Sequence, residues 1–393
     1  MIAFVQPYGL QAHGGGARIL RSLLADAPAP YAVVNTSPWA GPVKAAVDEI
    51  RLRRRPPAGR LDSSRAVRVI AHADRWLGGR FKRRLEATCR DLRATAIHAI
   101  PHGPEFWYAY EVARDLGIGY ALNVHDDLPY NLRGMPYLDW AMERLGKAWR
   151  GADARFVISE PMGRAFDERY GARAYSVVTD GLDEVADAPR PRVAGRLHIY
   201  LMGSIHLSYE ANFDQLFQAL AALRQSDPAL DVRLITRGGF PFPVRDRGVP
   251  REQRPWGTQE DVARDLEDVD ALYLPLPFGD EHAAFARYSL ATKLVTYLGT
   301  GLPIVYHGPS NAAAAELLRE HHAGALATRP DAIVLAETIA DAVDRSDELA
   351  SGALRLARSR FMMADQRRAF WKDMLPLARG TAAEPARHEL VGQ

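Results

Sequence analysis

The sequence predicts an α/β protein made of two doubly wound parallel sheets. Three observations lead to this fold class. Short apolar runs alternate with amphipathic helical stretches through most of the 393 residues. The runs are nearly continuous in apolar residues, which is typical of parallel strands buried on both faces. The alternation pauses once, near residues 184–195, and then resumes.

The apolar runs give the order of the predicted strands. Six runs predict the sheet of the first half: IAFV (2–5), YAVV (31–34), AIHAI (96–100), YALNV (120–124), ARFVIS (154–159) and YSVV (175–178). Five runs predict the second sheet: LHIYLMGS (197–204), VRLIT (232–236), ALYLPL (271–276), LPIVY (302–306) and GALAT (324–328). Helical patterns lie between most of them, so each half is Rossmann-like.

The pause between the two series predicts the domain boundaries. The stretch EVADAPRPRVAG (184–195) contains prolines, alanines and charges, as linkers do. We therefore expect an N-terminal domain over 1–188 and a C-terminal domain over 189–362. A helix over 363–379 is expected to return to the first domain, and 380–393 reads as a flexible tail.

Composition limits the class of protein. Hydrophobic residues make up 47% of the chain, enough for a sizeable core. The formal net charge of +2 argues neither for nor against nucleic acid. Cys89 is the single cysteine, which suits a reducing compartment. The start has no signal-peptide pattern and no apolar run approaches a membrane span, so we expect a cytoplasmic protein.

The segment SLATKLVTYLG (289–299) predicts an anion site. It follows a long irregular connection, and Ser289 is the expected N-cap of one helix. Free backbone N–H groups of Ser289, Leu290, Ala291 and Thr292 would then face a ligand, aided by the helix dipole. Lys293 adds a positive charge one turn in. The alternative is an ordinary capped helix with a solvated lysine.

Residues that follow two of the predicted strands in the first half are expected to face a ligand. Gly14, Gly15 and Gly16 follow the first strand and let a ligand approach the backbone closely. They do not form G-x-G-x-x-G, so a nicotinamide dinucleotide is disfavoured. His125 follows the predicted strand 120–124 and would donate to a sugar hydroxyl or relay a proton. A satisfied structural histidine is the alternative. Asp126 has no second ligand set nearby, so no metal site is expected.

The second half offers a turn, a cation and an aromatic ring. Gly203 and Ser204 form the turn after its first strand. Arg237 ends the next strand and would supply a fixed cation for phosphate, unless it is an ordinary surface arginine. Trp256 and Gly257 would present a flat face and backbone groups to a base. Thr258 then caps a helix with Asp261 at its third position.

At these residues the chain resembles a GT-B glycosyltransferase, specifically the large retaining family four. The second half carries the resemblance in Gly-Ser after a strand, Arg-Gly-Gly, WGTQED and SLATKLVTYLGTGLPIVYHGP, and the first half in HGGGARIL and VHDD. The resemblance implies two Rossmann-like domains facing across a deep cleft. It also implies transfer of a sugar from a nucleotide-diphosphate donor, UDP- or GDP-linked, with retention and without metal or cofactor. A glycan, a lipid-linked molecule or a small molecule would be the acceptor.

The resemblance assigns residues, with departures. It implies His125, Lys293 and Arg237 as catalytic, with the acceptor near Gly15 and His125. The implied donor-binding residues are Gly15, Gly16, Gly203, Ser204, Trp256, Gly257, Tyr288, Ser289, Leu290, Ala291, Thr292 and Thr296. The family has glutamates where this chain has Tyr288 and Thr296, and its diphosphate clamp is replaced by Ser204 and His206. A non-catalytic GT-B scaffold and a nucleotide-sugar epimerase are therefore alternatives.

A basic stretch lies in the first half. Residues 44–93 hold fifteen Lys or Arg against six Asp or Glu, with RLRRR (51–55) and RFKRR (80–84) at its centre. One interpretation is peripheral contact with anionic lipid at the inner face of a membrane. Nucleic acid is disfavoured because no recognition motif accompanies the charge. A solvated, arginine-rich face is the third interpretation.

Overall fold

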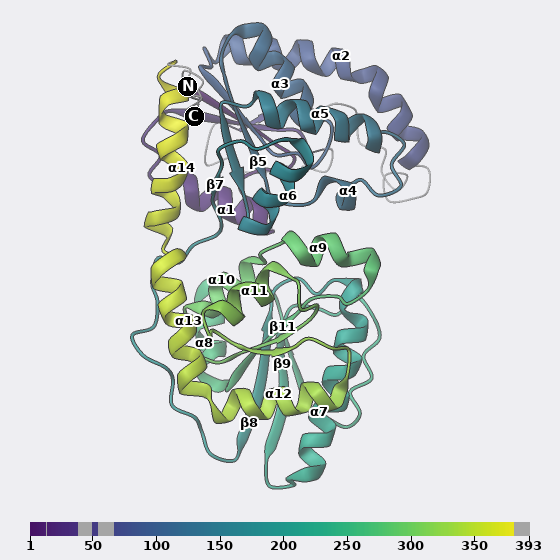
Figure 1. The fold of residues 1–393 in the computed structure, drawn as a ribbon, viewed down its shortest axis with the longest axis vertical. Coiled ribbons are helices and arrows are strands. Elements are labelled where there is room, and N and C mark those ends of the chain that lie inside the picture. Colours follow the sequence, from purple (N-terminus) through teal and green to yellow (C-terminus); the bar gives the residue numbers. More distant parts are fainter. Residues whose placement is uncertain (13, 38–48, 54–66, 381–393) are drawn as a thin grey trace, which may run out of the picture. The chain divides into compact units, whose positions relative to one another are not determined.

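The computed structural model describes residues 1–12, 14–37, 49–53 and 67–380. The chain forms two compact units (Figure 1). Unit 1 comprises Met1–Val178 together with the chain from Arg367 onward, and unit 2 comprises Thr179–Gln366. Each contains one parallel sheet, which confirms the predicted fold class. Within the described residues, no helix is both long and apolar enough to cross a bilayer.

Unit 1 is built on a seven-stranded sheet in the order β3-β2-β1-β4-β5-β6-β7. Its strands are β1 (Ile2–Gln6), β2 (Tyr31–Asn35), β3 (Glu49–Arg51), β4 (Ala96–Ala99), β5 (Gly119–Val124), β6 (Ala154–Val157) and β7 (Ser176–Val177). Its helices are α1 (Gly15–Leu24), α2 (Val67–Asp91), α3 (Glu105–Leu116), α4 (Leu128–Asn131), α5 (Leu138–Gly151) and α6 (Glu160–Tyr170). Every strand pair is parallel, and β1, β4 and β6 are buried along their length.

Unit 2 has a six-stranded parallel sheet in the order β10-β9-β8-β11-β12-β13. Its strands are β8 (Arg196–Met202), β9 (Asp231–Arg237), β10 (Arg251–Arg254), β11 (Ala271–Pro275), β12 (Ile304–His307) and β13 (Ala325–Ala327). Its helices are α7 (Glu210–Ser226), α8 (Gln259–Asp265), α9 (Ala283–Tyr288), α10 (Thr292–Leu298), α11 (Ala313–Glu320), α12 (Ala332–Asp344) and α13 (Ser346–Arg360). Two hydrophobic clusters form its core, one containing Phe213 and Ile339, the other Leu298 and Ala357.

The predicted strands are present, and two strands were missed. β3 and β10 have the sequences EIR and REQR, and both lie at an edge of their sheet. No residue of either strand is fully buried. A strand that gains little from burial can carry polar side chains and lack the apolar run that signals a buried strand.

The segment predicted as a linker is attached to unit 2. The backbone N–H of Ala186 donates to the carbonyl of Gly299, and that of Arg190 to the carbonyl of Gly301, both at 2.8 Å. The Arg190 side chain also donates to the carbonyl oxygens of Thr300 and Leu266. These bonds attach the segment to unit 2, which comprises Thr179–Gln366.

The last helix, α14 (Met363–Ala378), carries residues of both units. From Arg367 onward it packs within unit 1, where the Phe370 ring lies 4.9 Å from Phe156 and 5.6 Å from His98 between ring centroids. The Trp371 indole donates to the carbonyl of Leu23 at 2.9 Å. The residues beyond 380, predicted as a flexible tail, lie outside the described part of the chain.

Candidate functional site

Two glycines shape the carboxyl edge of the unit 2 sheet. Gly203 follows β8 with a φ of 88°, and Gly238 follows β9 with a φ of 124°. Both angles lie in the region that favours glycine. The N–H of Gly203 donates to the carbonyl of Arg237 at 3.0 Å. A Cβ on Gly238 would lie 2.8 Å from the Gly203 carbonyl oxygen. The ends of β8 and β9 therefore meet closely where parallel sheets bind ligands.

Lys293 projects to this edge from the first turn of α10. Its Nζ donates to the carbonyl of Ser204 at 3.2 Å and lies 5.5 Å from the centroid of the Tyr209 ring. No carboxylate among the described residues pairs with it. Burial lowers the pKa of the Lys293 ammonium to about 8. The side chain is thus mostly protonated at neutral pH, and its charge is uncompensated by any described neighbour.

The helix that carries Lys293 is shorter than predicted. The chain forms α9, then an extended break, then α10, where one helix beginning at Ser289 was expected. Ser289 is the C-cap of α9, and the N-cap of α10 is Ala291, which has no side-chain cap bond. The prediction that Ser289 caps the helix is therefore wrong. Extended ψ angles of 138° at Ser289 and 135° at Ala291 interrupt the helix on either side of Leu290.

Arg237 has an internal partner. Its guanidinium makes a two-pronged ion pair with Asp265, with Nη2 donating to Oδ1 at 2.8 Å, and donates to the carbonyl of Pro255 at 2.8 Å. Arg254 and Tyr200 also donate to Asp265. Burial opposes ionisation of Asp265, but these hydrogen bonds outweigh it and lower the pKa to about 2. The charge that we expected on a phosphate is neutralised inside the unit.

This ion-pair cluster supports the loop that holds Trp256. The carbonyl of Pro255, next to Trp256, is bound by Arg237. Gly257 leads into α8, where Thr258 and Asp261 form the predicted capping box. The Trp256 side chain itself is 63% exposed. A large aromatic ring on an anchored loop is thereby left open to solvent.

The two positions where the resembling family has glutamates supply no carboxylate. Tyr288 is 9% exposed, and the Arg287 guanidinium lies 5.5 Å from its ring centroid. Thr296 turns its hydroxyl back to the carbonyl of Thr292 at 3.3 Å. Within the described residues, no group of three or more His, Cys, Asp or Glu side chains could hold a metal ion.

His125 lies at the carboxyl edge of the unit 1 sheet, just after β5. It is 7% exposed, and neither ring nitrogen has a hydrogen-bond partner among the described residues. Burial and the nearby His102 ring lower its pKa to about 4, against the opposing effect of Asp126. The imidazole is therefore neutral at neutral pH and offers one donor and one acceptor, which are the two functions of a hydroxyl group.

Three neighbours of His125 extend this site. His102 follows β4, its ring centroid is 6.2 Å from that of His125, and its Nε2 lies 3.0 Å from Oδ2 of Asp126. Tyr8 follows β1, with its ring centroid 6.2 Å from His102 and its buried hydroxyl without a described partner. A Cβ on Gly16 would lie 2.5 Å from that hydroxyl, so glycine makes room for Tyr8. Gly15 begins α1 beside it.

Sequence reasoning missed Tyr8 and His102. The available signal was their position, since each lies a few residues beyond an apolar run. β1, β4 and β5 are neighbours in the sheet, so the residues after them meet at one edge.

A buried polar chain lies beneath this edge. Within the sheet, Nδ1 of His98 is 3.1 Å from the Gln6 amide nitrogen, and its Nε2 is 3.2 Å from the Asn123 amide nitrogen. Burial lowers the pKa of His98 to about 3, with a smaller effect from His125. Because a neutral ring has one N–H, it pairs best with one amide oxygen and one amide N–H. These contacts link β1, β4 and β5 through one buried histidine.

The fold has known counterparts, although no family model and no curated protein sequence matches the chain. A solved structure of HepE from Anabaena in complex with UDP superposes with a TM-score of 0.66 at 15% identity, covering 95% of this chain and 99% of that one. HepE with UDP-glucose gives 0.62 at 16% identity, with coverage of 95% and 99%.

A UDP-forming α,α-trehalose-phosphate synthase from Burkholderia xenovorans, in complex with glucose-6-phosphate, gives a TM-score of 0.64 at 14% identity. The match covers 95% of this chain and 99% of the synthase chain. These likenesses, over nearly the full length of both partners, show that the chain has the GT-B fold.

Proposed function

We propose that this chain is a glycosyltransferase that moves a sugar from a nucleotide-diphosphate sugar to a hydroxyl acceptor. The observation that carries the proposal is Lys293, a partly buried lysine without a described counter-ion beside the Gly203–Ser204 turn. A partly buried ammonium with no described carboxylate partner, at the ligand-binding edge of a parallel sheet, is stabilised when an anion binds there. A diphosphate supplies such an anion.

In the proposed reaction the bond between the anomeric carbon and the diphosphate oxygen breaks, and both electrons leave with the diphosphate. The acceptor oxygen bonds to the anomeric carbon, and its proton passes to the departing diphosphate oxygen. This front-side path retains configuration and needs no metal. Lys293 is held where negative charge grows, and a fixed donor in that position contributes about 3 kcal/mol to the transition state.

His125 and Tyr8 serve the hydroxyl groups of the substrates in this proposal. With a pKa of about 4, His125 is a weak general base. Its neutral ring instead pairs with a sugar hydroxyl, donating through one nitrogen and accepting through the other. The Tyr8 hydroxyl, whose pKa is raised by burial and by Asp126, stays protonated and can donate as well. The acceptor is a glycan, a lipid-linked molecule or a small molecule.

The comparisons support a uridine donor over a guanosine donor. HepE has been solved with UDP, UDP-glucose and glucose, and the trehalose-phosphate synthases are described as UDP-forming. In this chain the exposed ring of Trp256 is the proposed stacking surface for the base, with Gly257 offering its backbone. In this proposal the diphosphate meets Lys293 and the backbone between α9 and the start of α10, at Ser289, Leu290, Ala291 and Thr292.

Calorimetric titration with UDP and GDP tests the donor site, followed by hydrolysis and transfer assays with UDP-glucose. We expect UDP to bind and Lys293→Ala to weaken it, while Lys372→Ala on the exposed face of α14 does not. If neither UDP nor GDP binds at millimolar concentration, the enzyme proposal is excluded.

A non-catalytic GT-B scaffold is the second candidate. It is favoured by Tyr288 and Thr296, which leave the two glutamate positions of the resembling family without a carboxylate. A scaffold would bind UDP or UDP-glucose without releasing glucose or transferring it. An epimerase would release UDP from UDP-sugar without an acceptor.

We also propose that the enzyme works at the cytoplasmic face of a membrane through its basic stretch. Arg80, Arg83 and Arg84 on α2 are exposed, whereas Lys82 pairs with Asp115 at 2.7 Å. Five further basic residues of the stretch lie outside the described residues: Lys44, Arg54, Arg55, Arg60 and Arg65. Sedimentation with anionic vesicles tests this contact, and R80E/R83E/R84E should lose it. Equal recovery of this variant and the unmodified protein would count against membrane contact.

A further inference from the structure

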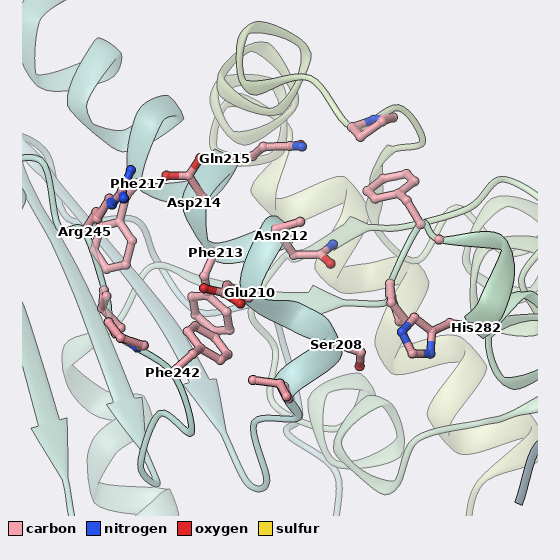
Figure 2. Close-up of a pocket in the computed structure, with 18 of the residues that line it drawn as sticks. Ser208, Glu210, Asn212, Phe213, Asp214, Gln215, Phe217, Phe242, Arg245 and His282 are labelled. Atoms are coloured by element: carbon pink, nitrogen blue, oxygen red, sulfur yellow. The ribbon is translucent and has the colours of Figure 1, made fainter.

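Unit 2 contains a cavity of about 940 Å³ that lies apart from the proposed donor residues. It is lined by the first turns of α7, the loop 242–245 after β9, the loop 277–282 after β11, and Pro330 (Figure 2). Lys293, Gly203 and Trp256 do not line it. The cavity nevertheless lies at the carboxyl edge of the sheet, because three of these segments follow strands.

Two amide side chains of α7 bring buried acceptors without donors to this cavity. Asn212 is 1% exposed, and its Nδ2 donates to the carbonyls of Leu276 at 3.0 Å and His307 at 3.1 Å. These bonds fix the orientation of the amide, so its Oδ1 remains an acceptor with no described donor. Gln215 lies three residues on, along the same face of the helix, and its buried Oε1 also has no described donor.

The charges of the lining disfavour an anionic ligand. Three carboxylates, of Glu210, Asp214 and Glu281, line the cavity against the single guanidinium of Arg245. Asp214 pairs with Arg247 at 3.0 Å, but Glu210 has no described partner. A phosphate would meet these carboxylates, whereas a ligand rich in neutral hydrogen-bond donors would satisfy them and both amide oxygens.

Aromatic rings complete the lining. Phe213 and Phe242 lie 6.0 Å apart between ring centroids, and Phe278 lines the cavity from the loop 277–282. Figure 2 shows Phe213 and Phe242 beside each other, with Gln215 and Asn212 on the same helix as Phe213. A lining that holds both aromatic rings and hydrogen-bond acceptors matches a pyranose, whose C–H face is apolar and whose hydroxyls donate.

We propose that this cavity binds a neutral saccharide of one or two hexose units, separate from the donor sugar. The inference rests on the proposed function only for the choice of a saccharide as ligand. A saccharide bound here would be a segment of the acceptor or of the product. Asn212, Gln215 and Glu210 would accept its hydroxyl hydrogens, and Phe242 would contact its apolar face.

Saturation-transfer NMR and calorimetry with glucose, maltose and cellobiose test the proposal, with UDP titrated in parallel. Gln215→Leu and Glu210→Gln remove one acceptor or one charge while leaving the Asn212 bonds that hold α7. We expect at least one of the three saccharides to bind, and each variant to weaken it about fivefold or more, near the effect of one hydrogen bond. Glu337→Gln, an exposed position on α12, should bind as the unmodified protein does.

The outcomes separate this inference from the proposed function. If none of the saccharides binds at tens of millimolar, or if Gln215→Leu and Glu210→Gln bind as tightly as the unmodified protein, the cavity is not a saccharide site. That conclusion holds whether or not UDP binds. If the saccharide binds, the variants weaken it and UDP fails to bind, the cavity assignment stands and the glycosyltransferase proposal falls.

Discussion

The carboxyl edges of the two sheets differ in how their polar groups are compensated. In unit 2, Arg237 and Arg254 pair with the carboxylates of Asp265 and Glu252, and Lys293 has no carboxylate partner among the described residues. In unit 1, His125 and the Tyr8 hydroxyl are neutral, buried and without described partners. The edge of unit 2 is therefore suited to an anion, and the edge of unit 1 is suited to hydroxyl groups. One fold repeated twice thus carries two kinds of chemistry, set by a few side chains after the strands.

The largest effect on the difference between the two edges is expected from removing the Lys293 ammonium of unit 2. Lys293→Ala should lower kcat/KM for transfer about 100-fold or more, the scale of a lost transition-state donor. Stability to urea should change little, because a desolvated lysine is removed and a small side chain replaces it. Lys372→Ala serves as the control. Transfer by Lys293→Ala at the unmodified rate would remove Lys293 from the site.

Arg237 should instead be important for stability. Arg237→Met leaves the buried Asp265 with fewer donors, and breaking a buried pair in this way costs about 3 kcal/mol. We expect the urea midpoint to fall, with UDP affinity of the folded variant reduced only modestly. A stable variant that no longer binds UDP would mean that Arg237 leaves Asp265 to bind phosphate.

Substitution at the carboxyl edge of unit 1 should lower kcat more than it lowers the affinity for the nucleotide. His125→Ala removes a neutral group that pairs with hydroxyls, so kcat should fall about tenfold, the effect of roughly 1.4 kcal/mol. The dissociation constant of UDP should stay unchanged in calorimetry. If UDP affinity falls more than kcat, His125 belongs to the nucleotide site.

The smallest effect is expected at Trp256. Loss of one aromatic ring from a base-stacking position costs about 1 kcal/mol. Trp256→Ala should therefore weaken UDP severalfold and Trp256→Phe should restore most of the affinity, as measured by calorimetry. Exposed Leu207→Ala is a control of similar exposure. Equal UDP affinity of Trp256→Ala and the unmodified protein would place the base elsewhere.

The sequence predicted the parts of the fold that depend on local pattern. Apolar runs located the interior strands together with β7 and β13 at one edge of each sheet, and Thr258 with Asp261 located the start of α8. The sequence could not predict β3 and β10, because these two polar strands are mostly outside the core and carry no apolar run. From the sequence, α9 is predicted as part of an irregular loop, and α10 is expected to begin at Ser289. Nothing in the residue types of Ser289, Leu290 or Ala291 forbids a helix.

The site was predicted unevenly for a similar reason. His125 and Lys293 were identified by their places after a strand and in a helix. The pairing of Arg237 with Asp265 joins β9 to the end of α8, and the meeting of Tyr8, His102 and His125 depends on strand order. Contacts between distant segments follow from sheet topology, which residue spacing does not reveal.

The pH dependence of UDP binding tests the central claim, that the Lys293 ammonium binds the diphosphate. Because its pKa is lowered to about 8, the bare site loses its charge as the pH rises through that value. We predict that UDP affinity falls above pH about 8, that Lys293→Arg keeps its affinity there, and that uridine binding does not change. Parallel pH profiles for UDP and uridine, or a Lys293→Ala profile that matches the unmodified protein, would contradict the account.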